Sequence, residues 1–158
     1  MTCRGRGTTH ATVKETINVP KGVDNGINLR MAKKGHTGSG GPNGDLIIHV
    51  KVRNHSYFKR EGAHIHTDLY LNISQAVLGC EVSVNSLYGD VTIKLPPGTQ
   101  HEARKKITNY GMYKLPPNHH DKGNHFVTVK VIIPKKLTEE QHLAMAKYAL
   151  TEQDIPQE

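Results

Sequence analysis

The sequence contains no tryptophan, and aromatic residues make up 5% of its 158 residues. It also lacks a run of about 18 consecutive apolar residues, the length needed for a membrane-spanning helix. We therefore expect no membrane partner. The first ten residues, MTCRGRGTTH, have no apolar stretch of the kind found in signal peptides. Hydrophobic residues still make up 35% of the chain, so a folded core is possible.

Cysteine is scarce as well. Cys3 and Cys80 are the two cysteines of the chain, and two thiols so far apart do not form a disulfide framework. Their number favours a reducing compartment. Glycine (15 residues) and proline (8 residues) are frequent, which indicates many turns between short strands and few long helices.

The charge is strongly unbalanced, with 21 Lys and Arg residues and a formal net charge of +7. Such a charge suggests an anionic partner, and a basic β-module that binds nucleic acid is one alternative. However, the basic runs are short, as at 33–34, 104–106 and 135–136, and few aromatic residues lie among them to stack on bases. We therefore interpret most of these charges as solvated faces.

The chain contains an internal repeat. Residues 19–35 match residues 95–111, because Gly22 corresponds to Gly98 and Gly35 to Gly111, each 76 positions further on. A second block, GDLIIHVKV at 44–52, matches GNHFVTVKV at 123–131 with an offset of 79. The three extra residues fall in the loop between the blocks, where insertions cost little.

Alternating apolar residues predict strands in both copies. ATVKETINV (11–19), GDLIIHVKV and HFVTVKVII (125–133) have this period-two pattern, and further strands are expected at 68–73, 81–84 and 90–95. The sequence therefore predicts a mainly β protein with two tandem β-sandwich-like subdomains, at 11–53 and 54–134, and short helices.

Two helices are expected. Residues Ser74 to Leu78 form a short one with Ser74 as its N-cap, ended by Gly79. The second begins with the capping box at 138–141 and extends through residue 150. It places Leu143, Ala146 and Leu150 on one face, which has to be buried somewhere. A partner protomer is one option, so residues 135–158 are predicted to be a dimerisation helix and tail.

The order of these blocks resembles the C-terminal region of class A DnaJ (Hsp40) co-chaperones over essentially the whole chain. The matching segments are CRGRG (3–7), HSYFKREGAHIHTDLYLNISQAVLG (55–79), LPPGTQ (95–100) and PKKLTEEQ (134–141). The sequence GAHIHTDLYLNISQAVLG (62–79) is most similar to the mitochondrial, tumorous-imaginal-disc type.

The resemblance implies a homodimeric, non-enzymatic co-chaperone that binds apolar segments of unfolded polypeptides and delivers them to Hsp70. Residues 1–10 correspond to the end of the family's zinc module, of which one cysteine is present. No zinc or other cofactor is therefore expected here, and zinc is expected only in the full-length protein. The J domain's His-Pro-Asp motif does not occur in the sequence. The implied compartment is the mitochondrion, with the cytoplasm as the alternative.

The resemblance also implies a client-binding groove in the first subdomain, where a peptide adds a strand to a sheet edge and inserts a side chain into a pocket. Matching the Pro-Gly and Gly-Asp landmarks assigns Leu46 and Ile48 to this groove, with Ile17 beside them. Glu15 occupies a pocket position that is apolar in the family.

An enzyme is the third alternative. His64, His66 and Asp68 share one face of a predicted strand and are similar to the HxHxDH motif of metal hydrolases. The motif's last histidine is absent, because position 69 is Leu. We therefore interpret these residues as part of a strand edge and expect no metal site. Because the basic residues are interpreted as solvated faces, we expect no nucleic acid partner either.

Overall fold

The computed structural model describes residues 12–37, 41–117 and 120–152. The chain divides into two compact units. The first contains the residues up to Arg53 together with Tyr113–Asp121, and the second contains Asn54–Met112 and the residues from Lys122 onward. Each unit is described by itself below.

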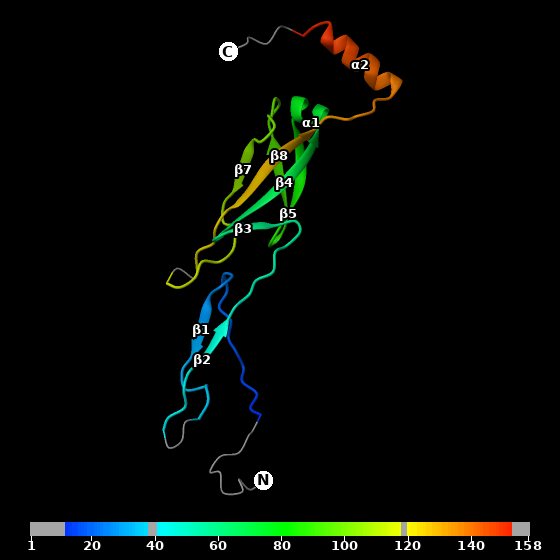
Figure 1. Cartoon of the computed structure of the whole chain (residues 1–158). Coiled ribbons are helices and arrows are strands. Elements are labelled where there is room, and N and C mark those ends of the chain that lie inside the picture. The colour runs from blue at the N-terminus through cyan, green and yellow to red at the C-terminus, as the bar shows by residue number, and fades with distance from the viewer. Residues whose placement is uncertain (1–11, 38–40, 118–119, 153–158) are drawn as a thin grey trace, which may run out of the picture. The chain divides into compact units, whose positions relative to one another are not determined.

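The first unit contains an antiparallel hairpin of β1 (Asn28–Met31) and β2 (Leu46–His49) (Figure 1). The connection between the strands is closed at its base, where the Gly35 N–H donates to the carbonyl of Gly44 at 2.7 Å. The predicted strand at 44–52 therefore exists, but it is four residues long.

The side chain of Asp45, just before β2, interacts with residues at and after the end of β1. The carboxylate of Asp45 accepts a hydrogen bond from the Lys33 backbone N–H at 2.9 Å and lies 2.6 Å from the Arg30 guanidinium. These two interactions, the backbone hydrogen bond first, hold the pKa of Asp45 below its usual value. The aspartate stays ionised and fixes the register just before β2.

The predicted strand at 11–19 is wrong over its described residues, because residues 12–20 form no strand. Its period-two pattern is real, but a strand also needs a neighbour to receive its hydrogen bonds. In the described part of the first unit, β1 and β2 pair with each other and the segment 12–20 pairs with neither.

The second unit contains a four-stranded sheet and a separate hairpin (Figure 1). The sheet has the order β3-β4-β8-β7, in which β4 and β8 run parallel. The strands are β3 (Lys59–Glu61), β4 (His64–Asn72), β5 (Cys80–Ser86), β6 (Gly89–Leu95), β7 (Arg104–Ile107) and β8 (His125–Ile132). The predicted strands at 68–73, 81–84, 90–95 and 125–133 all lie largely within these elements, whereas β3 and β7 were not predicted.

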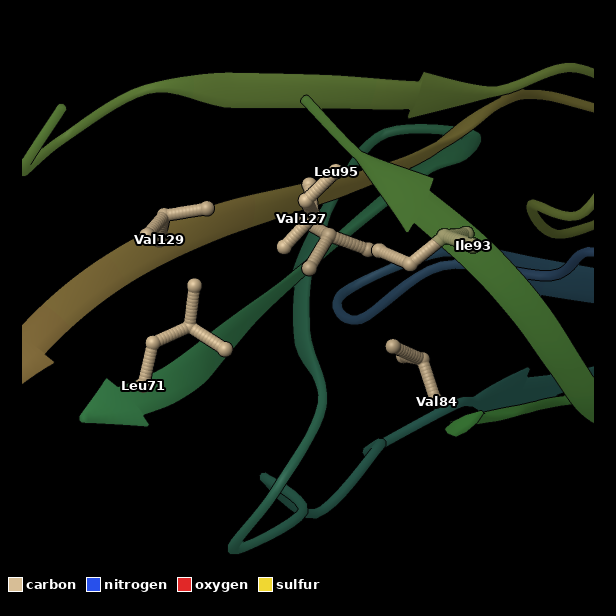
Figure 2. Close-up of a cluster of buried hydrophobic side chains, with 6 residues drawn as sticks. All are labelled: Leu71, Val84, Ile93, Leu95, Val127 and Val129. Carbon is tan, nitrogen blue, oxygen red and sulfur yellow. The ribbon is translucent and has the colours of Figure 1, made fainter. Parts of the chain in front are cut away.

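The hydrophobic core lies between the sheet and the hairpin. Figure 2 shows its six buried side chains pointing toward one another from β4, β8, β5 and β6: Leu71, Val84, Ile93, Leu95, Val127 and Val129. Alternate residues of each strand supply this core, as the period-two patterns predict. The mainly β, sandwich-like fold class is thus confirmed.

The two helices begin at capping residues. Helix α1 (Ile73–Leu78) has Asn72 as its N-cap and not the predicted Ser74, because Gln75 reaches back to the Asn72 N–H at 3.0 Å. Helix α2 (Glu139–Ala149) begins with the predicted capping box between Thr138 and Gln141. No helix in the described ranges is long and apolar enough to cross a membrane.

The sequence repeat is also a structural repeat. Strand β7 lies 76 residues after β1, and β8 begins 79 residues after β2. The strand pairing is preserved with these offsets, since the pair Asn28–His49 in β1 and β2 becomes Arg104–Thr128 in β7 and β8. Each unit therefore contains one copy of the same two-stranded element.

The loops of the two copies agree in detail. The Gly35–Gly44 hydrogen bond recurs as Gly111 N–H to the Gly123 carbonyl at 2.9 Å. The turn glycine at position 22 has φ +85° and its counterpart at 98 has φ +75°, a region that favours glycine. The repeat can therefore be used to compare equivalent residues in the two units.

Candidate functional site

Strand β2 carries two of the four predicted client-binding residues. Leu46 and Ile48 lie half-buried on one face of the hairpin, whereas Ile47 on the opposite face is 57% exposed. Leu46 is paired with Met31 and Ile48 with Leu29, so all four side chains share a face. The hairpin thus presents a small apolar surface, which we call the hairpin face: Leu29, Met31, Leu46 and Ile48.

The other two predicted residues lie on the segment that precedes β1. Ile17 is 42% exposed, and the Glu15 carboxylate forms an ion pair with the Lys34 ammonium at 2.8 Å. Both partners of this pair are partly solvated, so it contributes at most about 1 kcal/mol. The Glu15 carboxylate, at a position where the resemblance leads us to expect an apolar side chain, is therefore paired with the Lys34 ammonium.

The repeat shows what the hairpin face corresponds to in the second unit. Leu46 and Ile48 correspond to His125 and Val127, which are completely buried. Ile17 corresponds to Ile93, a core residue with 6% exposure. The predicted client-binding residues therefore occupy positions that face a core in the other copy.

In the second unit, β4 pairs with β8 along its whole length and the β5–β6 hairpin covers the sheet face. The described residues of the first unit contain no counterpart of β4 or β5, and β2 pairs there with β1 alone. Within the described residues, one edge of β2 therefore has no strand partner, and the apolar face beside it is half-buried. Such a surface can bind an extended polypeptide through main-chain hydrogen bonds and apolar contacts.

The predicted dimerisation residues lie on an exposed face of α2. Leu143 is 62% exposed, Leu150 is 87% exposed and Ala146 is also exposed. Other residues of α2, including Met145 and Tyr148, line a groove of about 640 Å³ together with α1 and residues 133–137. All residues of α2 are exposed, those of the predicted stripe included.

The residues of the enzyme alternative do not converge. Asp68 forms an ion pair with Lys59 at 3.0 Å, and the His66 ring stacks on Phe126 at 5.2 Å between centroids. The Nδ1 atom of His64 accepts a hydrogen bond from the Asn124 N–H. Over residues 12–37, 41–117 and 120–152, no group of three His, Cys, Asp or Glu side chains could hold a metal ion. Cys3, which the resemblance assigns to the end of a zinc motif, lies outside these residues.

Sequence reasoning did not find two members of the hairpin face, Leu29 and Met31. They alternate with Asn28 and Arg30, which is the signal of a strand, but the strand is only four residues long and is followed by Lys33 and Lys34. The alternation of apolar residues is too short, and too close to these lysines, to be recognised as a strand from the sequence.

Taken together, the described residues define a β protein with a repeated strand pair, a half-buried apolar hairpin face and an exposed helix α2. The family described as "DnaJ C terminal domain" matches residues 4–134. The chain belongs to this family.

Curated relatives agree with this assignment. The chain is 38% identical over 149 residues to the chaperone protein DnaJ of Prochlorococcus marinus and 38% identical to that of Bacillus cereus. It is 40% identical over 149 residues to the chaperone protein DnaJ of Gloeobacter violaceus. Each alignment covers 94% of this chain and 39–40% of the relative. The chain therefore spans about two-fifths of the length of these bacterial relatives.

Proposed function

We propose that this chain is the client-binding and self-associating part of a DnaJ-type co-chaperone. It holds apolar segments of unfolded polypeptides and, when joined to a J domain, delivers them to Hsp70. It performs no chemistry on them. The relatives are named chaperone proteins, which supports this role, and the chain's own residues supply the surface.

The observation that carries the proposal is the half-buried apolar hairpin face beside the edge of β2 that has no strand partner within the described residues. Main-chain pairing to β2 accepts almost any sequence, because every residue except proline offers the same hydrogen-bonding groups. Leu46 and Ile48 add selectivity for apolar side chains. Such a combination gives weak and sequence-tolerant binding, which suits a chaperone.

Two substitutions on the same strand test the proposal. Ile48→Asp places a carboxylate on the hairpin face, and we expect it to weaken suppression of aggregation of a chemically unfolded client. Ile47→Asp makes the same chemical change on the opposite, exposed face and serves as the matched control. Circular dichroism checks that both variants keep their fold. Equal protection by the two variants would place client binding elsewhere.

Self-association through α2 is part of the same proposal. The stripe of Leu143, Ala146 and Leu150 is exposed in a single chain, and burying one leucine contributes roughly 1.5–3 kcal/mol. Two copies related by a two-fold axis would make each contact twice. We therefore propose a homodimer that is sensitive to dilution, because the interface is small.

The mitochondrial, tumorous-imaginal-disc assignment remains a prediction, and the relatives named above are bacterial. The nucleic-acid alternative receives no support from the comparisons. Ionic strength distinguishes it from client binding, because affinity for phosphate falls steeply with salt and apolar binding does not.

A further inference from the structure

The interior of the second unit contains a completely buried histidine at the start of β8. His125 has 0% exposure, and its Nε2 lies 2.8 Å from the hydroxyl of Thr67, which is also buried. Its Nδ1 is buried and has no hydrogen-bond partner among the residues that the structure describes. A protonated imidazole in this place would lose its hydration without gaining an anionic partner, so the site accommodates the neutral ring.

Two more histidines lie on the neighbouring strand β4, against the side chain of Phe126. His66 stacks on that ring, and His64 meets its edge at 5.5 Å between centroids. His64 Nδ1 accepts the Asn124 N–H at 3.0 Å, immediately before β8 begins. A protonated imidazole donates from both nitrogens and cannot accept this bond. We call His64, His66 and His125 the histidine cluster, although His64 and His66 lie on the Phe126 face of the sheet and His125 lies on the opposite, core face.

The charged groups around the cluster do not offset a proton on His125. Strand β3 contributes Arg60 and Glu61, and the Glu61 carboxylate lies 3.1 Å from Nε2 of His66 and not beside His125. Strand β7 contributes cations, including Lys105 on the face of the sheet that His125 shares. Strand β4 adds Asp68, which Lys59 already binds. Neither carboxylate, Glu61 or Asp68, is therefore paired with His125.

The remaining elements packed on this face bring no charge. Helix α1 has no ionisable residue, and the inward-facing positions of β5 and β6 are apolar apart from Cys80 and Ser86. Burial first, and the nearby His66 second, lower the pKa of the His125 imidazole below its usual value.

The repeat shows that the fold does not require histidine at this position. The counterpart of His125 in the first unit is Leu46, an apolar residue of similar size. A histidine here costs stability when it must be protonated. In return, its neutral ring makes the hydrogen bond with the buried Thr67 hydroxyl, which leucine could not make.

We infer that the buried His125 makes the second unit proton-sensitive, so that the unit is less stable at mildly acidic pH than at neutral pH. The sign follows from linkage. Because the imidazole of His125 has a lowered pKa in the folded unit, the unfolded chain binds the proton more readily. The stabilising contribution is complete above the ordinary imidazole value of about 6.5 and is lost as the pH falls below it.

Urea unfolding of the intact chain at pH 7.5, 6.5 and 5.5, followed by circular dichroism, tests this inference. With His125 neutral in the folded unit, its proton uptake alone raises the unfolding constant about tenfold between pH 7.5 and 5.5. The double variant Thr67→Val/His125→Leu removes both hydrogen-bonding partners and installs the residue of the first repeat. We expect it to lose this tenfold rise. His142→Gln, on the exposed helix α2, should keep it.

A second measurement tests the inference even when the double variant does not fold. The ring nitrogens of His125, observed by NMR in the folded wild-type chain at pH 5.5, should report a neutral imidazole. A charged His125 ring in the folded chain would overturn the inference. A folded double variant that unfolds with the wild-type acid dependence would overturn it as well.

Discussion

Replacing the side chain by alanine at two equivalent positions of the repeat should reduce stability at one position and client binding at the other. Val127 in β8 is completely buried in the core of the second unit. Ile48 occupies the corresponding place in β2, where it is half-buried on the hairpin face. Val127→Ala should therefore mainly reduce stability, and Ile48→Ala should mainly reduce client binding.

The magnitudes follow from burial. Val127→Ala removes two buried methyl groups, each worth about 0.8 kcal/mol, and leaves a cavity, so we expect a loss of about 2–3 kcal/mol in the second unit. Ile48→Ala removes three carbons that are only partly shielded from water. We expect about 1 kcal/mol in the first unit for this change.

Amide hydrogen exchange measures the two units separately, because each amide reports the opening of its own region. The amides of β8 should exchange roughly thirtyfold faster or more in Val127→Ala, and those of β2 about fivefold faster in Ile48→Ala. Aggregation assays with an unfolded client should show the larger loss for Ile48→Ala. Equal destabilisation by both variants would refute the reasoning, because it would mean that the hairpin face is covered.

Other predictions concern single features of the second unit. Ending the chain after Pro134 should give a folded monomer, whereas the intact chain should dimerise on concentration in sedimentation experiments; an intact chain that stays monomeric would argue against α2. Lys130 lowers the pKa of Glu102, first by a hydrogen bond and then by its charge, so this ion pair should persist at neutral pH and below the ordinary glutamate value, and be lost only as the pH falls through the lowered pKa. NMR titration of Glu102 checks this, and an unshifted midpoint would contradict it. Gly123→Ala should lower the melting temperature strongly, because its Cβ would lie 2.0 Å from the Ala63 carbonyl oxygen, while Gly41→Ala, with nothing within 4 Å, should not.

Much of the fold could be predicted because its signals are local. The alternation in 125–133 places Val127 and Val129 on one face, and this strand is present at the expected position. The capping box at Thr138 fixes the start of α2 through bonds between residues three apart. The matched glycines of the repeat reflect turns that both units share.

The parts that were missed depend on partners distant in the sequence. The segment 12–20 has the alternation of its counterpart β6, but β6 is a strand because β5 pairs with it. Strand β7 consists mainly of cationic residues, so it has no apolar pattern from which a strand could be predicted. It is a strand because it pairs with β8. The assignment of Tyr113–Asp121 to the first unit likewise follows from three-dimensional contacts within that unit, such as Lys21 over the Tyr113 ring at 5.1 Å.

The candidate site was predicted in part for the same reason. The structure brings Leu46 and Ile48 together on one hairpin face and adds Leu29 and Met31 to it. Ile17 lies on a segment without regular structure, and its place beside a client remains a prediction. Which side chains of two paired strands share a face can be stated only after the register of the pair is known.

The central claim is that unfolded polypeptides bind the hairpin face of the first unit. NMR titration of the intact, isotope-labelled chain with an unlabelled apolar peptide tests it most directly, because each signal reports one residue. The account predicts that the methyl and amide signals of Leu29, Met31, Leu46 and Ile48 shift first and furthest, at both low and high salt. Shifts confined to the second unit or to α2, with the hairpin face unchanged, would contradict it.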